Sequence, residues 1–268
     1  MSAVLWGEVN RNSTAQQAIE LAMIGSPGWA KQSQSRHKSA KLTNLIRRTA
    51  ERLSTHSRLR RGRLFLERLQ PSPNDKILDL GGGRGGYMAQ TLPFRSNVTI
   101  ADLDPHNLKI AAASYGFETL QLDASEQFPV DEGQYDIVFC SSVIEHVTGP
   151  KEITYHSEDG REFTASAKAG QANFAAEVRR IAKRYFVQTP YKYFPIEQHS
   201  FLPFIVVLLP RRWQVRLMRF LTAHGWFKPA YLDFRLLTIK EMRALFPDAE
   251  IVLERYCGFV KSIVAIKT

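Results

Sequence analysis

The chain has 268 residues, 44% of them hydrophobic and 23% charged, with two cysteines and a formal net charge of +10 at pH 7. Its length suits one sizeable hydrophobic core, and two cysteines supply neither a disulfide framework nor a zinc site, which favours a cytoplasmic location. No apolar run is long enough for a signal-peptide core at the N-terminus or for a membrane span, which argues against a transmembrane protein.

The N-terminal arm is the basic part of the chain. Residues 1–70 hold thirteen Lys or Arg against four Asp or Glu, which accounts for +9 of the net charge. Apolar residues at helical spacing over residues 36–69 predict two amphipathic helices with arginines on their outer faces. A charged face of this kind is usually solvated. The helices could simply cover one edge of the core or form a lid over the ligand site, and we expect residues 1–60 to be a helical arm that does both.

Residues 76–104 contain the pattern around which the chain is organised. An apolar run, Ile77–Leu80, leads into the glycine cluster Gly81–Gly86, and a helix-compatible segment and a second β-rich run that ends on Asp102 follow. The pattern predicts a strand, a tight turn, a helix and a strand, which is half of a nucleotide-binding βαβ unit. Glycines permit the turn and the close approach of a ligand, and an acid at the second strand's tip is placed to accept hydrogen bonds from a ribose diol.

Two ligand classes fit this glycine cluster. Gly81-x-Gly83-x-x-Gly86 satisfies the dinucleotide fingerprint of an NAD-type oxidoreductase. The spacing Asp79-x-Gly81-x-Gly83-x-Gly85 resembles the first motif of class I S-adenosylmethionine-dependent methyltransferases. That resemblance implies that Asp79 helps to hold the aminoacyl end of S-adenosylmethionine through water or backbone contacts.

The next expected elements are a helix over Pro105–Tyr115 and a strand over Phe117–Leu122. Asp123 and Ala124 follow this strand, where the family binds adenine. The resemblance implies that the Asp123 carboxylate contacts the exocyclic amine and that the Ala124 N–H contacts a ring nitrogen; the alternative role for Asp123 is a turn or helix cap. The full set of expected cofactor-binding residues is Asp79, Gly81, Gly82, Gly83, Asp102, Leu103, Asp123, Ala124 and Ser141.

A fourth strand, Tyr135–Cys140, is apolar enough to be buried on both faces, and Ser141–Val147 follows at its ligand-binding end. The run YDIVFCSSVIEHV resembles the post-adenine motif of methyltransferases that act on quinones, sterols and natural products. In the ubiquinone-pathway O-methyltransferases a Glu-x-x-Glu-His sequence there can hold a divalent metal. Glu145 and His146 match it, but Ser142 replaces the first acid, so we predict no metal. His146 is a candidate base, or it fixes the loop structurally together with Glu145.

Residues 150–171 are expected to be a polar insert beside the active-site face. Ile153–His156 and Glu162–Ala165 are β-permissive, and Asp159-Gly160 between them predicts a hairpin turn. The elements expected after the insert are an amphipathic helix over Ala172–Lys183 and a fifth strand over Tyr185–Gln188.

The loop after the fifth strand carries a second group of candidate catalytic residues. Its sequence, TPYKYFPIEQH, resembles that of a bacterial methyltransferase subfamily in which Phe-Pro-x-Glu-x-His follows this strand. A histidine suits deprotonation of a hydroxyl that attacks a methyl group, so His199 is a candidate base and Glu197 the residue that orients it. Tyr191 and Tyr193 are expected to form an aromatic wall. The alternative is a Glu–His pair that only fixes the loop.

The remaining residues are expected to close the sheet. Residues 201–232 contain an apolar run followed by arginines interleaved with aromatic and aliphatic residues, which predicts an inserted helical cap; an interfacial helix or a collar around an apolar substrate is the alternative. Thr238 and Glu241 predict a capping box at the start of a further helix that ends near Phe246. The closing pair of strands is expected over Glu250–Tyr256 and Lys261–Ile266.

These elements together predict an α/β fold with a Rossmann-like, seven-stranded sheet. The sheet is expected to be mostly parallel with its last strand antiparallel, and to carry helices on both faces and an N-terminal helical lid. The resemblance divides the chain into the arm, residues 1–60, and a methyltransferase domain, residues 61–268. It implies S-adenosylmethionine as the cofactor and O-methylation of a small-molecule, glycan or lipid-linked acceptor.

Three rival functions stay open. An oxidoreductase needs a hydride-transfer constellation such as Tyr-x-x-x-Lys after the fourth strand, and none follows it. A nucleic-acid methyltransferase fits the basic arm and Thr189-Pro190-Tyr191, but the Asn-Pro-Pro-Tyr motif of base methylators belongs where Cys140–Ser142 stands. The third rival is a protein that keeps the cofactor site and only binds a partner. Peripheral membrane contact is compatible with the sequence, and the oligomeric state is open.

Overall fold

The computed structural model describes residues 55–123, 127–149, 159–194, 209–223 and 233–268. The chain divides into two compact units, Met1–Arg58 and Leu59–Thr268. Only residues 55–58 of the first unit are described, so the predicted lid lies outside the described residues.

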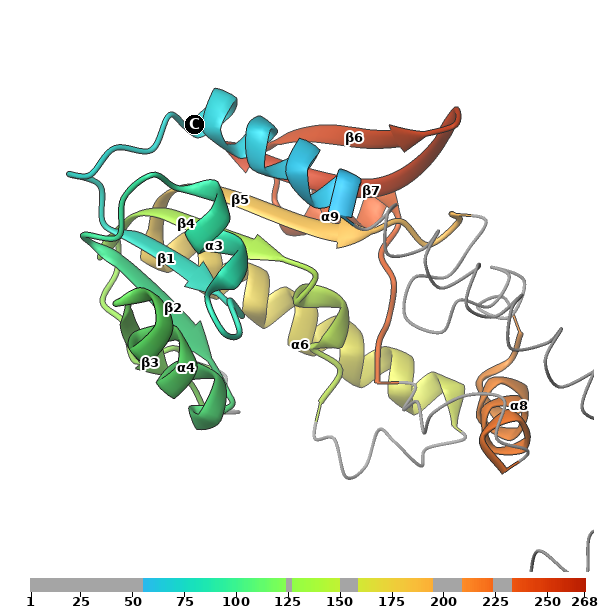
Figure 1. The fold of residues 1–268 in the computed structure, drawn as a ribbon. Coiled ribbons are helices and arrows are strands. Elements are labelled where there is room, and N and C mark those ends of the chain that lie inside the picture. The colour runs from blue at the N-terminus through green and yellow to red at the C-terminus, as the bar shows by residue number, and fades with distance from the viewer. Residues whose placement is uncertain (1–54, 124–126, 150–158, 195–208, 224–232) are drawn as a thin grey trace, which may run out of the picture. The chain divides into compact units, whose positions relative to one another are not determined.

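A seven-stranded sheet in the order β3-β2-β1-β4-β5-β7-β6 forms the centre of the second unit (Figure 1). The pairs from β3 to β5 are all parallel, whereas β7 runs antiparallel to both β5 and β6. The predicted mixed sheet with an antiparallel last strand is therefore confirmed. The strands are β1 Ile77–Leu80, β2 Val98–Asp102, β3 Glu118–Gln121, β4 Tyr135–Ser141, β5 Ala182–Pro190, β6 Glu250–Tyr256 and β7 Phe259–Lys267.

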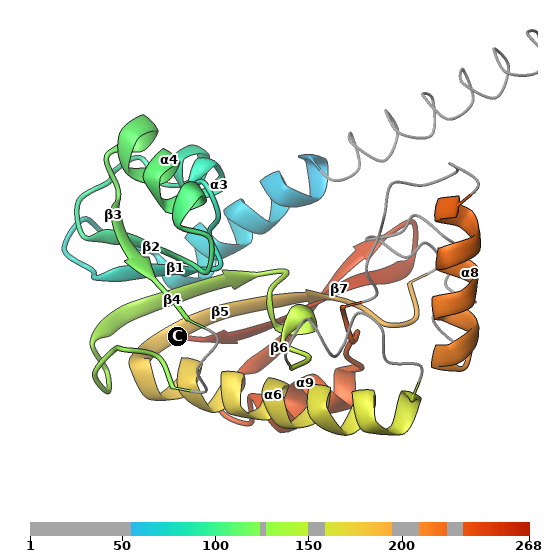
Figure 2. The same cartoon turned by 90° about the horizontal axis from the view of Figure 1, so that it is seen from below.

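Helices cover both faces of this sheet (Figure 2). One face carries α3, α4 and a helix that runs to residue 69, whose residues 59–69 we call the cover helix; the other carries α6 and α9. None of the helices that the structure describes is long and apolar enough to cross a membrane. The helices are α3 Gly86–Thr91, α4 Pro105–Tyr115, the 3₁₀ turn η1 Ile144–His146, α6 Gly160–Ile181, α8 Arg211–Ala223 and α9 Ile239–Leu245.

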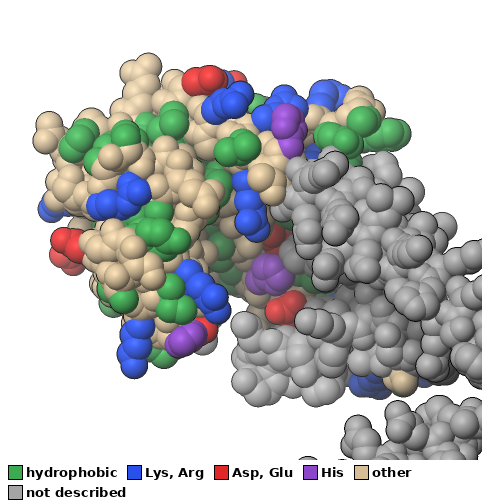
Figure 3. All heavy atoms as spheres, viewed as in Figure 1, with side chains coloured by type: hydrophobic (Ala, Val, Ile, Leu, Met, Phe, Trp, Pro, Cys, Tyr) green, Lys and Arg blue, Asp and Glu red, His purple; other side chains and the backbone are tan. Residues whose placement is uncertain are grey.

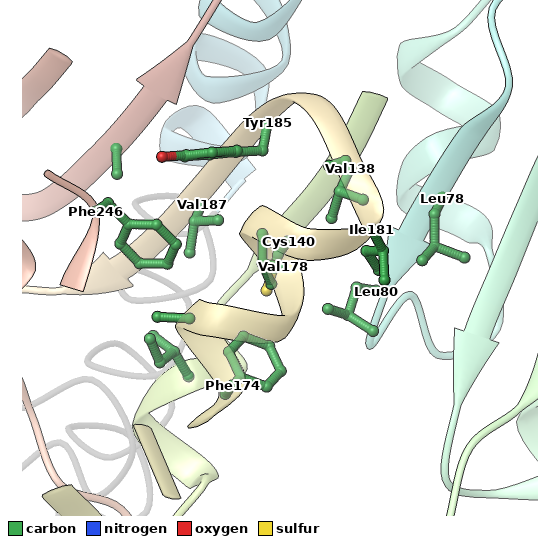
Figure 4. Packing of buried hydrophobic residues seen from close by; sticks show 14 of the residues in the cluster. Leu78, Leu80, Val138, Cys140, Phe174, Val178, Ile181, Tyr185, Val187 and Phe246 are labelled. Atoms are coloured by element: carbon green, nitrogen blue, oxygen red, sulfur yellow. The ribbon is translucent and has the colours of Figure 1, made fainter. Parts of the chain in front are cut away.

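Two hydrophobic cores result from the alternation of side chains along the central strands. On one face Cys140, Tyr185 and Val187 pack with residues of α6 and α9 (Figure 4). On the other face the rings of Phe65, Phe139 and Phe186 pack together, with Phe65 and Phe139 centroids 4.9 Å apart. Because the central strands are buried on both faces, their ends are the parts of the sheet that remain available to a ligand.

Local capping signals explain where several helices begin. Thr238 Oγ1 accepts from the Glu241 N–H while the Glu241 carboxylate accepts from the Thr238 N–H, which confirms the predicted capping box of α9. The hairpin predicted at Asp159-Gly160 is wrong. The Asp159 carboxylate accepts from the N–H groups of Arg161 and Glu162 and so caps α6, which starts at Gly160 and runs for 22 residues.

Candidate active site

The glycine turn between β1 and α3 depends on conformations that other residues rarely adopt. Gly81, Gly83 and Gly85 all have positive φ, of 75°, 56° and 74°. A Cβ at Gly81 would lie 2.4 Å from Val143 Cγ2, whereas a Cβ at Gly83 would meet no heavy atom within 4 Å. The turn is therefore packed tightly on the protein side and open at Gly83, as a site for a bound ligand requires.

Asp79 lies directly beneath this turn. Its side chain is buried, and Oδ2 has no hydrogen-bond partner among the residues that the structure describes. A Cβ at Gly82 would lie 2.4 Å from that oxygen, so only glycine fits above it. Burial, with a smaller contribution from the charge of Asp102, raises the pKa of Asp79 to about 7. Burial of a carboxylate oxygen to which none of the described residues donates is costly, so a donor to Oδ2 would stabilise this part of the structure.

Asp102 lies at the tip of β2, beside β1 in the sheet. Its Oδ2 accepts from the Gly83 N–H at 3.0 Å, and its Oδ1 accepts from the Asp104 N–H at 2.9 Å and from Asn107 Nδ2 at 3.4 Å. These bonds fix the carboxylate against the glycine turn. Leu103, the next residue, is half-exposed at the same edge.

The expected adenine contacts fall at the end of β3. The strand ends at Gln121, and Asp123 is exposed two residues further on. Ala124 lies outside the described residues. The adenine role of this pair therefore stays a prediction.

A buried arginine that the sequence argument did not single out reaches the end of β4. Arg61, in the cover helix, donates from Nη1 to Ser141 Oγ at 2.7 Å, and Ser141 Oγ donates to Gln188 Oε1 at 2.8 Å. Only 6% of Arg61 is exposed, and its Nε has no partner within the described part of the chain. Ser142, with φ of 60°, also donates to Gln188 Oε1, at 3.2 Å. Arg61 lies four and eight residues before the buried Phe65 and Leu69, which places it on the apolar face of the helix. This position is the feature of the sequence from which a buried arginine could have been predicted.

Glu145 and His146 have different surroundings. Glu145 is fully buried, and its Oε2 accepts from Thr189 Oγ1 at 3.0 Å, which ties η1 to the end of β5. His146 is one-third exposed, with Nδ1 3.5 Å from Asp233 Oδ1 and its ring edge-on to Phe234. Figure 3 shows a recess in this side of the molecule with a histidine and an acidic side chain inside it. Among the described residues no cluster of three or more His, Cys, Asp or Glu is suited to a metal ion.

The second group of candidate catalytic residues is not described. Glu197 and His199 lie outside the described residues, so their predicted roles are untested. Tyr191 and Tyr193 precede them, and their rings lie edge-to-face with centroids 5.5 Å apart. The N–H of Tyr191 donates to the Lys261 carbonyl at 2.9 Å, which holds the start of this loop to β7.

Known proteins resemble parts of this chain. Residues 78–155 match the family described as "Methyltransferase domain". The ubiquinone biosynthesis O-methyltransferase of Bordetella parapertussis is 32% identical over 117 residues, which cover 41% of this chain and 45% of that protein. The enzyme of the same name from Acinetobacter baumannii is 31% identical over 117 residues, covering 41% and 46%. This chain thus spans slightly less than half the length of these relatives.

Solved structures of methyltransferases align over a larger share of the chain, at lower identity. The trans-methyltransferase CalH in complex with SAH aligns with 76% of this chain and 55% of its own, at 18% identity and a TM-score of 0.47. Magnesium protoporphyrin IX methyltransferase from Synechocystis PCC 6803, also with SAH, aligns with 96% of each chain, at 14% identity and a TM-score of 0.41.

Residues 78–155 are therefore similar to a methyltransferase domain, and the sheet order and the glycine turn agree with the fold that the resemblance to class I S-adenosylmethionine-dependent methyltransferases predicts. The part that matches the methyltransferase-domain family runs from β1 past η1, and so includes Asp79, Asp102 and His146.

Proposed function

We propose that this chain binds S-adenosylmethionine and transfers its methyl group to an oxygen of a small-molecule, glycan or lipid-linked acceptor. The observation that carries the proposal is the buried Asp79 carboxylate, whose Oδ2 has no partner among the described residues and which lies under a glycine turn whose next strand ends in Asp102. The name of the relatives from Bordetella parapertussis and Acinetobacter baumannii, ubiquinone biosynthesis O-methyltransferase, supports oxygen as the acceptor atom.

The residues around the glycine turn fit the parts of this cofactor. Asp102 is fixed where a ribose diol donates to it, and the opening at Gly83 admits the ligand close to the backbone. Asp79 accepts from the amino group, directly or through water. Arg61 Nε–H, at the same end of the sheet, has no acceptor among the described residues, and a guanidinium suits a carboxylate such as that of the cofactor's aminoacyl end.

When bound, S-adenosylmethionine supplies an electrophilic methyl group on a sulfonium centre. A hydroxyl acceptor must lose its proton as the new bond forms, and a positioned base accelerates this step. We assign that base to His146, because it follows β4 at the ligand end of the sheet and its side chain is partly accessible. Asp233, near Nδ1, orients the His146 ring so that Nε2 receives the proton from the acceptor hydroxyl. His199 with Glu197 is the second candidate for the same task.

Calorimetry with the full chain tests the cofactor assignment. S-adenosylhomocysteine and S-adenosylmethionine should bind, and NAD⁺ should not. Tight binding of NAD⁺ without either of the others would replace the proposal with the oxidoreductase reading. Methyl transfer from labelled S-adenosylmethionine to a metabolite extract then tests the activity. Binding without transfer to any extract would support the rival in which the site serves only to bind a partner.

A further inference from the structure

The Arg61 guanidinium is held from two sides. Ser141 accepts from Nη1, as described, and the Glu254 carboxylate on β6 accepts from Nη2 at 3.3 Å. Both members of this ion pair are largely buried, with side chains 8% and 16% exposed. A buried pair with this geometry fixes an arginine far better than a surface pair does, because solvent screens it less.

The strand that carries Glu254 is irregular at this position. Glu254 pairs with Ser262 across β6 and β7, whereas the next residue, Arg255, pairs with Val260, so the register shifts between them. Irregularities of this kind re-aim side chains and are common beside active sites. Ser262 is fully buried, and its Oγ has no partner among the residues the structure describes. The register shift therefore lies where Glu254 reaches the guanidinium.

The ion pair influences Tyr87 in α3, the helix that follows the glycine turn. Burial raises the pKa of Tyr87, the second residue of α3, to about 12; the charge of Arg61 lowers it, and the charges of Glu254 and Asp79 raise it further. One hydroxyl beside the glycine turn is therefore influenced by all three charged groups. The cover helix also approaches α3 closely at Gly62, where a Cβ would lie 3.3 Å from Thr91 and 3.5 Å from the Tyr87 hydroxyl.

We propose that Glu254 is a positioning residue for Arg61, and that together they form a subsite for the carboxylate of the cofactor. Glu254 accepts from Nη2 and Ser141 from Nη1, so the side chain is held in place while Nε–H has no acceptor in the described part of the chain. Preorganisation of this kind lowers the entropy cost of binding. The inference rests on the proposed function, since it assumes that a carboxylate-bearing cofactor binds here.

The test compares two ligands by calorimetry: S-adenosylhomocysteine and its decarboxylated analogue, S-adenosylthiopropylamine. The native chain should prefer the first. Glu254→Ala should weaken S-adenosylhomocysteine binding by on the order of tenfold and change binding of the analogue by less than about twofold. Glu254→Gln should recover most of the loss, because its amide oxygen still accepts from Arg61.

Glu250→Ala is the matched control. Glu250 also pairs on β6 with an arginine of the cover helix, Arg68, but this pair is more exposed and lies toward the other end of the strand. The substitution should leave the affinity for both ligands unchanged. If Glu254→Ala lowers the melting temperature, the comparison between the ligands still tests the proposal, because partial unfolding weakens the binding of both ligands to the same extent.

Several results would overturn the inference. Equal losses for the two ligands in Glu254→Ala would show a general effect on the fold. Unchanged or tighter S-adenosylhomocysteine binding by Glu254→Ala would show that Glu254 does not position Arg61 or that it competes with the ligand for it. If Glu254→Gln bound S-adenosylhomocysteine as weakly as Glu254→Ala, the effect would come from the charge of Glu254 and not from the position in which it holds Arg61. Native protein that binds neither ligand would instead refute the proposed function.

Discussion

Asp102 accepts a hydrogen bond from the N–H of Gly83, 3.0 Å away, and so joins the tip of β2 to the turn that follows β1. The same carboxylate is therefore both a structural tie of the turn and the proposed ribose ligand. Asp102→Ala should weaken S-adenosylhomocysteine binding by about 2–4 kcal/mol, since it removes charge-assisted bonds to the ligand and loosens the turn. Calorimetry on the native and variant chains measures the change, and an affinity within twofold of native would contradict the assignment.

Gly83 and Gly133 provide a matched pair for the glycine turn. Both have positive φ, 56° and 61°, and a Cβ at either would meet no heavy atom within 4 Å. Alanine at either position should thus cost a similar 1–2 kcal/mol or so of unfolding free energy, from backbone strain alone. Only Gly83→Ala should also abolish S-adenosylhomocysteine binding, because its Cβ would occupy the space left for the ligand. Equal affinities in the two variants would show that the opening at Gly83 is not the site.

Asp79 should make the stability of the cofactor-free protein depend on pH. Its pKa is raised from 3.8 to about 7 in the folded state, so between these values the folded chain binds more protons than the unfolded chain. The contribution of Asp79 to stability is therefore present below about pH 4 and is lost as the pH rises toward 7, a change on the order of 4 kcal/mol. Asp79→Asn should remove this part of the pH dependence, so that the variant is more stable than native at pH 8 and binds cofactor more weakly.

Urea unfolding at pH 5 and pH 8 checks this expectation. The informative quantity is the difference between native and Asp79→Asn, because other groups titrate equally in both. If the two proteins lost stability in parallel as the pH rose, Asp79 would be charged and compensated in the free protein. The prediction that Asp79 is an uncompensated buried acid in the ligand-free protein would then be wrong.

His146→Ala should lower the turnover number by roughly 10²–10⁴-fold, the contribution of a positioned base, without changing the affinity for S-adenosylhomocysteine. The measurement uses labelled methyl transfer to an acceptor found in the extract screen. His106→Ala is the control, because His106 is an exposed histidine of α4, away from η1. If the turnover number fell only a few-fold in His146→Ala but by a large factor in His199→Ala, the base would be His199 in the loop after β5.

The elements nearest the glycine cluster were predictable because their signals are local. Apolar runs bounded by glycines and acids indicated β1, β2 and β4, and Thr238 with Glu241 indicated the start of α9. The start of α6 was mispredicted because Asp159-Gly160 is compatible with both a turn and a helix cap. The apolar residues Phe163, Ala167, Phe174 and Val178 at helical spacing favour the helix, in which all four are buried.

The partners of the site residues were not predictable in the same way. Asp233 is 87 residues from His146, and Glu254 is 193 residues from Arg61, so each pairing depends on how the sheet brings distant segments together. No local pattern in one sequence reports such a contact. The position of Arg61 on an apolar stripe was visible, but its partner was not.

The position of β7 has a consequence for the order in which the protein folds. Strands β1 to β5 pair with one another in the order β3-β2-β1-β4-β5, whereas β7 lies between β5 and β6 and comes after both in the sequence. During synthesis β5 must therefore wait with an unpaired edge, and β6 has no partner strand until β7 emerges. Glu254 and Ser262 meet only at this step, so the Arg61 subsite is among the last parts of the molecule to form. A nascent chain halted before residue 259 would expose that edge to other chains, and we expect it to aggregate.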